Sequence, residues 1–367
     1  MTTSSRFKYC INGRFLTRQI TGVDRYAREI VHELDSLLGK GEAVLLLPED
    51  CAPIDWEATQ NIELRHYGKR KGHAWEQLDL SRYVRKNGLL AINLCNTAPV
   101  LNPGVVCIHD MNVRANPSFY GWKFRTYYRA MFWFLTRRAK LVLTVTHFSE
   151  SEIEKYYPCA RGRISVVPCA WQHIERVVQD NSVLERTGLE SGAYYFAMSS
   201  LAPNKNLKWI VETARLNPGC TFAVAGGINT KVFGEHDIPE ADNVKYLGYV
   251  SDEEAKALMS HCRAFLYPTF YEGFGMPPME AMASGAQAVV VGDNPCMHEV
   301  YGESVCYINP NLPCHELDSF ASFEDNKAER QTLLGKYSWT QSADMLKMIL
   351  DGVSSARMPD ASNANSR

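Results

Sequence analysis

The sequence of 367 residues has no long apolar run, no paired cysteine motif and no low-complexity block. Because no apolar stretch reaches the roughly 18 residues that span a bilayer, and residues 1–6 are polar, we expect a cytoplasmic chain without a signal peptide. The eleven cysteines form no Cys-x-x-Cys pair, which favours free thiols in a reducing compartment over a zinc or thioredoxin-like site. A formal net charge of −2 disfavours general nucleic-acid binding.

The sequence also lacks the Gly-x-Gly-x-x-Gly fingerprint after its first strand-like segment. This absence disfavours a dinucleotide oxidoreductase, which is one alternative on a similar sheet. What the sequence does contain is an alternation of short apolar segments and amphipathic helices, which predicts an α/β fold with parallel sheets. The strand-like segments are residues 8–12, 43–47, 62–67, 89–93, 105–108, 141–145, 164–167, 194–198, 222–225, 244–247 and 264–267.

The length of the chain is sufficient for two domains of ordinary size. We expect a first Rossmann-like domain at residues 1–175 and a second at residues 176–338. Residues 339–351 then form a terminal helix, and the Ser/Ala/Asn-rich residues 352–367 are expected to be disordered.

The strongest ligand-binding pattern lies between residues 264 and 291. A strand at 264–267 ends at a proline, a loop containing Gly273 and Gly275 follows, and a helix is predicted at 278–284, with two prolines at its start and a glycine after its end. The first N–H groups of such a helix favour an anion, and the loop glycines allow a ligand close to the backbone. This stretch therefore predicts a phosphate site at the carboxyl edge of the sheet.

Two carboxylates flank this predicted phosphate site, Glu272 in the loop and Glu280 near the start of the helix. An ionised carboxylate only accepts hydrogen bonds, so it pairs well with sugar hydroxyls and poorly with phosphate. The combination predicts a site for a nucleotide-linked sugar. The alternative is an ordinary turn between a strand and a helix, with two solvated glutamates.

The stretch Y-E-G-F-G-x-P-x-x-E-A-M-A-x-G resembles the signature of the retaining glycosyltransferases of family 4, which have the GT-B fold of two Rossmann-like domains facing a cleft. The resemblance implies that Glu280 holds the nucleotide ribose and that Glu272 contacts the transferred sugar. It also implies that the intervening backbone approaches the sugar and the diphosphate. The residues that would supply this backbone are Gly273, Phe274, Gly275 and Met276.

The first half of the chain resembles the same family at two places. The run I-T-G-V-x-R-Y-A-x-E is similar to the family's first loop and helix, which implies that Gly22 lies over the donor diphosphate. The run V-x-I-H-D implies that His109 is an active-site residue near the donor sugar, with Asp110 as a further candidate. Taken alone, a loop glycine is usually a turn, and a histidine after a buried strand is usually structural.

The run S-S-L-A-P-N-K-N-L-K-W-I opens the second domain. Lys205 aligns with the family's lysine, which implies that it neutralises the leaving diphosphate, whereas a lone loop lysine is otherwise usually solvated. Ser200 stands where many relatives carry arginine, and it is a candidate donor-binding residue. Asn206 is predicted to cap the helix that begins at Leu207.

The segment from Met111 to Ser149 is basic and aromatic, with seven Lys or Arg residues and no acidic residue. Such a helix can lie on an anionic bilayer, and the alternative is a core helix with a solvated face. The basic residues are Arg114, Lys123, Arg125, Arg129, Arg137, Arg138 and Lys140, and the aromatic ones are Phe119, Tyr120, Trp122, Phe124, Tyr127, Tyr128, Phe132, Trp133 and Phe134.

Together these resemblances imply a retaining glycosyltransferase that moves a sugar from a GDP-, UDP- or dTDP-sugar. We expect it to be cytoplasmic, either free or peripheral on the inner face of the plasma membrane. The acceptor is expected to be a saccharide or a lipid-linked saccharide, as in bacterial mannosyl or rhamnosyl transfer. No cofactor and no metal ion are expected, since the Asp-x-Asp triplet of metal-dependent sugar transferases is missing. The terminal helix is expected to cross back to the first domain. The second alternative is a non-catalytic sugar-binding or membrane scaffold.

Overall fold

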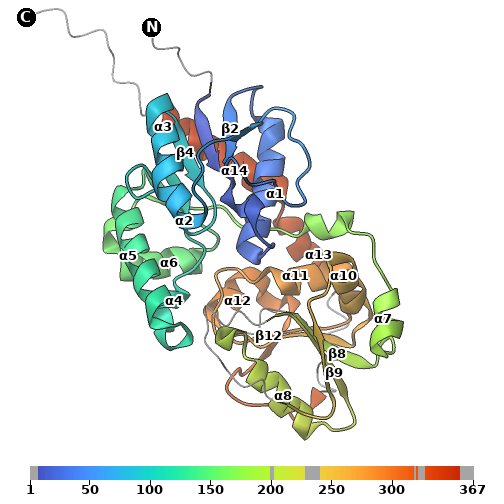
Figure 1. Cartoon of the computed structure of the whole chain (residues 1–367). Coiled ribbons are helices and arrows are strands. Elements are labelled where there is room, and N and C mark those ends of the chain that lie inside the picture. Colours follow the sequence, from blue (N-terminus) through green and yellow to red (C-terminus); the bar gives the residue numbers. More distant parts are fainter. Residues whose placement is uncertain (1–6, 199–201, 228–239, 318–319, 321–326, 356–367) are drawn as a thin grey trace, which may run out of the picture. The chain divides into compact units, whose positions relative to one another are not determined.

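The structure is a computed structural model, and the chain divides into two compact units (Figure 1). The first unit comprises Met1–Asp110, Ala130–Pro168 and Trp339–Arg367, and the second comprises Met111–Arg129 and Cys169–Ser338. Each unit is built on one parallel sheet, so the predicted fold class is confirmed. The structure describes residues 7–198, 202–227, 240–317, 320 and 327–355.

The described part of the first unit contains a seven-stranded parallel sheet with the order β3-β2-β1-β4-β5-β6-β7. The strand order reverses between β1 and β4, and such a switch point opens a ligand crevice at the carboxyl ends of the strands. The central strands are fully buried and consist mainly of apolar residues, as expected for a sheet with both faces covered. The strands are β1 (Tyr9–Asn12), β2 (Ala43–Leu47), β3 (Glu63–His66), β4 (Leu90–Asn93), β5 (Val105–Cys107), β6 (Leu141–Thr144) and β7 (Ile164–Val166).

Helix α1 carries the apolar stripe that the sequence predicts, because Tyr26, Ile30 and Leu34 are all buried. Before this helix, residues Gly13–Thr17 form a short 3-10 helix whose Phe15 and Leu16 are buried. The helices of this unit are η1 (Gly13–Thr17), α1 (Gly22–Leu37), α2 (Gly72–Ala74), the π-helix η2 (Trp75–Leu80), α3 (Ser81–Asn87), α6 (His147–Tyr156), η4 (Pro158–Ala160) and α14 (Trp339–Ser355).

The terminal helix α14 packs against α1 in the first unit, as expected (Figure 1, red beside blue). The Thr340 hydroxyl donates a hydrogen bond to Glu33 Oε2 at 2.9 Å, and the Ser342 hydroxyl donates to the Pro168 carbonyl at 2.9 Å. The helix continues to Ser355, so the disordered tail predicted from residue 352 onward is wrong for residues 352–355. Val353 continues the spacing of the buried Leu346 and Leu350, and this apolar stripe keeps the backbone helical past Gly352.

The described part of the second unit contains a six-stranded parallel sheet with the order β10-β9-β8-β11-β12-β13. Its order reverses between β8 and β11, so the loop predicted to bind phosphate leaves the sheet at a switch point. Large buried side chains such as Tyr195, Trp209 and Phe222 form its core. The strands are β8 (Tyr194–Met198), β9 (Thr221–Ala225), β10 (Val244–Gly248), β11 (Ala264–Tyr267), β12 (Val289–Gly292) and β13 (Cys306–Ile308).

Helix α10 begins with a capping box, in which Ser251 and Glu254 each accept a backbone N–H. The helices of the second unit are α4 (Asn112–Ala115), η3 (Pro117–Phe119), η5 (Gln172–Arg176), α7 (Ser182–Thr187), η6 (Pro203–Lys205), α8 (Leu207–Leu216), α10 (Asp252–His261), α11 (Met276–Ser284), α12 (Pro295–Tyr301), η7 (Gly302–Ser304) and α13 (Lys327–Lys336). Helix α5 (Trp122–Arg138) is continuous, and the division between the units falls within it.

The chain passes to the second unit between Pro168 and Cys169, ahead of the predicted boundary at residues 175 and 176. The short helix η5 joins the second unit because its neighbours are there. The Trp171 indole donates to the Leu334 carbonyl at 2.9 Å, and the Gln172 side chain donates to the Tyr337 carbonyl at 2.9 Å. Residues Met111–Arg129 also group with the second unit, where Phe119 lies 6.2 Å from Phe270 between ring centroids.

Candidate active site

The loop between β11 and α11 has the backbone conformation that its glycines predict. Gly275 precedes α11 with a φ of 79°, and Gly285 follows the helix with a φ of 94°. The positive φ of Gly275 favours glycine, and a Cβ atom there would lie 2.7 Å from the methyl carbon at the flexible end of Met297, which would have to shift. The predicted short helix is confirmed, and it begins two residues early, at Met276.

Two carbonyl groups of this loop are held by side chains from α12. The Cys296 thiol donates to the Phe274 carbonyl at 3.7 Å, and the Tyr301 hydroxyl donates to the Gly275 carbonyl. In a trans peptide the next N–H points opposite to the carbonyl. The N–H groups of Gly275 and Met276 therefore point away from α12, at the positive end of the α11 dipole.

Lys205 and Glu272 come together beside this loop. The Lys205 ammonium donates to Glu272 Oε1 at 2.7 Å and to the Tyr267 hydroxyl at 2.8 Å. The side chains of Lys205 and Glu272 are only 18% and 11% exposed, so the pair is poorly screened by solvent. Burial raises the pKa of Tyr267 well above its usual range, which keeps this hydroxyl neutral as a partner for the ammonium.

The loop after β8 is tied to the loop after β11 by the residues around Lys205. The Phe270 N–H donates to the Asn204 carbonyl at 3.0 Å. Asn206 is the N-cap residue of α8 as predicted, but its side chain does not cap the helix. It has a φ of 59°, and its amide instead donates to the carbonyls of Pro268 and Pro310 at 3.0 and 2.7 Å. The capping prediction is therefore wrong, because two loop carbonyls compete for this side chain.

Glu280 has a partner that the sequence analysis missed. His173 Nε2 lies 3.0 Å from Glu280 Oε1, and the side chains are 4% and 13% exposed. His173 is on η5, 107 residues before Glu280 in the chain, so no local motif links the two. The only sign in the sequence that His173 could belong to the site was its position as a polar residue after the apolar strand β7. The contact fixes one carboxylate oxygen of Glu280 and leaves the other oxygen as an acceptor.

His109 lies in the first unit, just after β5, and its ring is held on two sides. Ring nitrogen Nε2 lies 2.8 Å from the Leu94 carbonyl, and the Tyr26 ring packs edge-on with centroids 4.9 Å apart. Burial lowers the pKa of His109 to about 4, so the ring is neutral near pH 7. Because a carbonyl only accepts, Nε2 carries the hydrogen, and Nδ1 is the acceptor nitrogen.

Gly22 is the exposed first residue of α1, and a cluster of charged side chains surrounds it. The buried Asp24 carboxylate accepts from the Thr21 N–H and hydroxyl at 3.1 and 2.6 Å. Both Nε and Nη2 of Arg18 donate to the other Asp24 oxygen, at 2.8 and 2.6 Å. Arg18 is thus a cation four residues before Gly22 that the sequence analysis did not single out.

The sequence of this chain is similar to those of known glycosyltransferases. Residues 185–337 match the family described as Glycosyl transferases group 1. The chain is 29% identical over 274 residues to the O-antigen chain mannosyltransferase B of Escherichia coli, covering 68% of this chain and 71% of that protein. It is also 29% identical over 232 residues to the O-antigen chain mannosyltransferase RfbU of Salmonella typhimurium, covering 61% of this chain and 62% of that protein.

The structure is similar to solved glycosyltransferases along nearly its whole length. Sucrose-phosphate synthase from Thermosynechococcus elongatus matches with a TM-score of 0.70 and 13% identity, covering 95% of this chain and 99% of that chain. HepE from Anabaena, solved in complex with UDP-glucose, matches with a TM-score of 0.69 and 15% identity, covering 94% and 99%. The chain is a glycosyltransferase with the GT-B fold.

The predicted site residues of this glycosyltransferase fall into two groups. Lys205, Glu272 and Glu280 lie together in the second unit, inside the residues that match the family. His109 and Gly22 lie in the first unit, where α1 provides both Gly22 and the Tyr26 ring beside His109. Asp110 directly follows His109 and is partly exposed. Ser200 lies outside the described residues.

Proposed function

We propose that this glycosyltransferase is a retaining, metal-independent hexosyltransferase that uses a nucleotide-sugar donor in bacterial polysaccharide synthesis. The observation that carries the proposal is the Lys205–Glu272 pair beside the glycine loop and the start of α11. The O-antigen mannosyltransferase relatives support a mannosyl transfer, and the proposal also includes rhamnosyl transfer and a saccharide or lipid-linked saccharide as acceptor.

The proposed leaving group is a nucleoside diphosphate, on which negative charge develops as the bond from the sugar carbon breaks. Preorganised donors stabilise such charge because they need no rearrangement during the reaction. The donors that we assign to it are the Lys205 ammonium and the N–H groups of Gly275 and Met276, which point away from α12. These groups supply positive charge where other transferases use a divalent cation.

Glu280 is the proposed partner of the ribose hydroxyls, and Glu272 is the proposed partner of the transferred sugar. Each carboxylate has one oxygen in a contact that fixes its orientation, with His173 for Glu280 and with Lys205 for Glu272. A fixed carboxylate binds a hydroxyl without first losing rotational freedom. His109 accepts a hydrogen bond from the sugar or the acceptor through Nδ1 in this proposal.

The experiment is a transfer assay in the presence of EDTA, with GDP-mannose, UDP-glucose and dTDP-rhamnose as donors. Product NMR reports the anomeric configuration. We expect turnover of one donor, with retention and without added metal. Inversion, or activity only with a divalent cation, would refute that part of the proposal. Nucleoside diphosphates at 100 times their dissociation constant should stabilise the fold by about 2.7 kcal/mol, and no stabilisation by any of them would favour a scaffold instead.

We also propose that helix α5 docks on the anionic inner face of the plasma membrane, where a lipid-linked acceptor would lie. The two tryptophans Trp122 and Trp133 are three helical turns apart and are 67% and 45% exposed, whereas Phe132 and Leu135 are buried. The exposed residues Arg129 and Arg137 lie on the same stripe. Tryptophan and arginine on one exposed helix face are typical of an interfacial helix.

The membrane proposal predicts salt-sensitive binding to anionic vesicles and weak binding to neutral ones. Each basic residue near the surface adds about 1 kcal/mol, within a Debye length of about 8 Å. The variants are Arg129→Glu and Arg137→Glu, each made singly. Arg65→Glu, on the exposed strand β3, is the control with the same change of net charge. Equal sedimentation with both vesicle types, or no difference between these variants, would mean that α5 is a surface helix only.

A further inference from the structure

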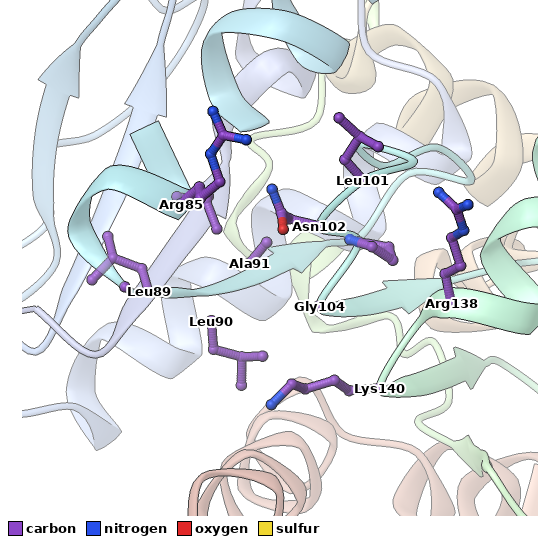
Figure 2. Close-up of a pocket in the computed structure, with 12 residues that line it drawn as sticks. Arg85, Leu89, Leu90, Ala91, Leu101, Asn102, Gly104, Arg138 and Lys140 are labelled. Atoms are coloured by element: carbon purple, nitrogen blue, oxygen red, sulfur yellow. The ribbon is translucent and has the colours of Figure 1, made fainter. Parts of the chain in front are cut away.

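The first unit contains a pocket of about 320 Å³ at the amino ends of β4 and β5 (Figure 2). Gly104, directly before β5, lies in its wall, whereas His109 follows the opposite end of the same strand. This amino-edge pocket is therefore separate from the part of the candidate active site that lies in this unit. The comparisons and the signature residues assign nothing to it.

The amino-edge pocket is positively charged. Its lining includes Arg85, Arg138 and Lys140, and no acidic residue. Figure 2 shows the side chains of Arg85 and Arg138 on either side of Asn102. Within the part of the chain that the structure describes, neither guanidinium forms a hydrogen bond or ion pair, and the Arg138 guanidinium lies 5.6 Å from the Phe134 ring centroid. Because two arginines and no carboxylate line the pocket, the electrostatic potential inside it is positive.

The wall of the pocket is held in place by the backbone and by one buried contact. Gly104 has a φ of 58°, and a Cβ atom there would lie 2.2 Å from the Ala91 carbonyl oxygen, so these two backbones are in direct contact. The Asn102 amide donates to the Ser81 hydroxyl at 3.2 Å, which anchors its side chain to α3, the helix that carries Arg85. The position of the cations is thus set by regular elements of the fold.

We propose that the amino-edge pocket binds the phosphate group of a small phosphomonoester or of an anionic phospholipid head group. A guanidinium presents a planar fork of N–H donors that matches phosphate oxygens, and two such forks suit one doubly charged anion. The volume is at the lower end of the range for small-molecule pockets, which favours a phosphate with a small organic group. The exposed Leu101 in the lining would contact the apolar part of a lipid.

The experiment measures the binding of glycerol 1-phosphate by isothermal titration calorimetry to the full chain and to Arg85→Ala and Arg138→Ala. Arg82→Ala is the matched control, because Arg82 is exposed on the same helix and does not line the pocket. Lys205→Ala is included because the second unit is also expected to bind phosphate. We expect affinity about tenfold weaker in each pocket variant, unchanged affinity in Arg82→Ala, and weaker binding at high salt.

A second arm of the experiment distinguishes the two sources of phosphate. Vesicles of phosphatidylcholine, with and without phosphatidylglycerol, are sedimented with wild type, Arg85→Ala and Arg82→Ala. If Arg85→Ala weakens the binding of glycerol 1-phosphate, the ligand is a soluble phosphomonoester. If Arg85→Ala weakens only the binding to anionic vesicles, the ligand is a lipid head group. The proposal is overturned if Arg85→Ala equals Arg82→Ala in both arms, or if only Lys205→Ala loses binding.

Discussion

The candidate site residues of the second unit are held by charged contacts, whereas His109 in the first unit is held as a neutral ring. In the second unit, Lys205 is paired with Glu272, and the Glu280 carboxylate has His173 as its partner. In the first unit, His109 is buried as a neutral ring with a carbonyl partner. Buried charges need partners, whereas a neutral ring needs only a hydrogen bond. The comparison supports the proposal that the second unit binds charge and that His109 acts through neutral hydrogen bonding.

Removal of Lys205 should have the largest effect on activity. Lys205→Ala takes away the proposed diphosphate cation and leaves Glu272 without its partner, so we expect kcat/KM to fall by a factor of about 10² to 10³. Lys208→Ala is the matched control, because Lys208 is 77% exposed and three residues further on. Steady-state kinetics with the preferred donor measure both variants. If the two variants behave alike, charge in the second unit has no special role.

The neutral state of His109 predicts a pH dependence of stability. The pKa of His109 is about 4 in the folded chain, and its ordinary value, expected in the unfolded chain, is 6.5. Between pH 4 and pH 6.5 the unfolded chain therefore binds more protons than the folded chain. The free energy of unfolding should therefore fall as pH drops from 6.5 toward 4, by about 3 kcal/mol in total from this group. Urea unfolding at several pH values measures it. His109→Gln should lose this component, and an equal slope in both proteins would contradict the neutral assignment.

Glu280→Ala should weaken nucleotide binding by about 1.5–3 kcal/mol, because it removes a charged acceptor from the ribose hydroxyls. Calorimetry with the nucleoside diphosphate measures the affinity. Glu299→Ala is a control outside the proposed ribose contact. Unchanged affinity in Glu280→Ala would remove Glu280 from the donor site and leave its contact with His173 as a structural one.

His173→Ala should have the smallest effect, because His173 only orients Glu280. We expect nucleotide affinity to fall about fivefold to tenfold, as for one lost hydrogen bond. His173→Gln, which keeps a donor, should restore part of the loss. In the Glu280→Ala background the His173 change should cost nothing further, and this double-mutant cycle distinguishes positioning from general destabilisation. Additive losses would argue against the positioning role.

The amino-acid sequence alone predicted most strands of both sheets and the glycine loop, but it did not predict β13 (Cys306–Ile308). The segments predicted at 43–47, 194–198 and 264–267 coincide with β2, β8 and β11. These predictions succeed because buried apolar runs and glycine conformations are local properties of the chain. The glycine loop was recognised in the same way, because the two glutamates that flank its predicted phosphate site are eight residues apart.

Contacts between distant segments were decided only by the tertiary structure. His173 meets Glu280 across 107 residues because η5 packs against α11. Lys205 meets Glu272 across 67 residues because the neighbouring parallel strands β8 and β11 bring the loops that follow them to one edge of a sheet. Asn206 binds two loop carbonyls in place of capping α8, and Val353 extends α14 beyond the predicted end. The partners of Asn206 come from distant parts of the chain, so no local pattern encodes them, whereas the apolar stripe through Val353 is a local pattern, and the predicted helix ended too early to include it. The sequence therefore determined which residues could do chemistry, and the fold determined which of them are held together.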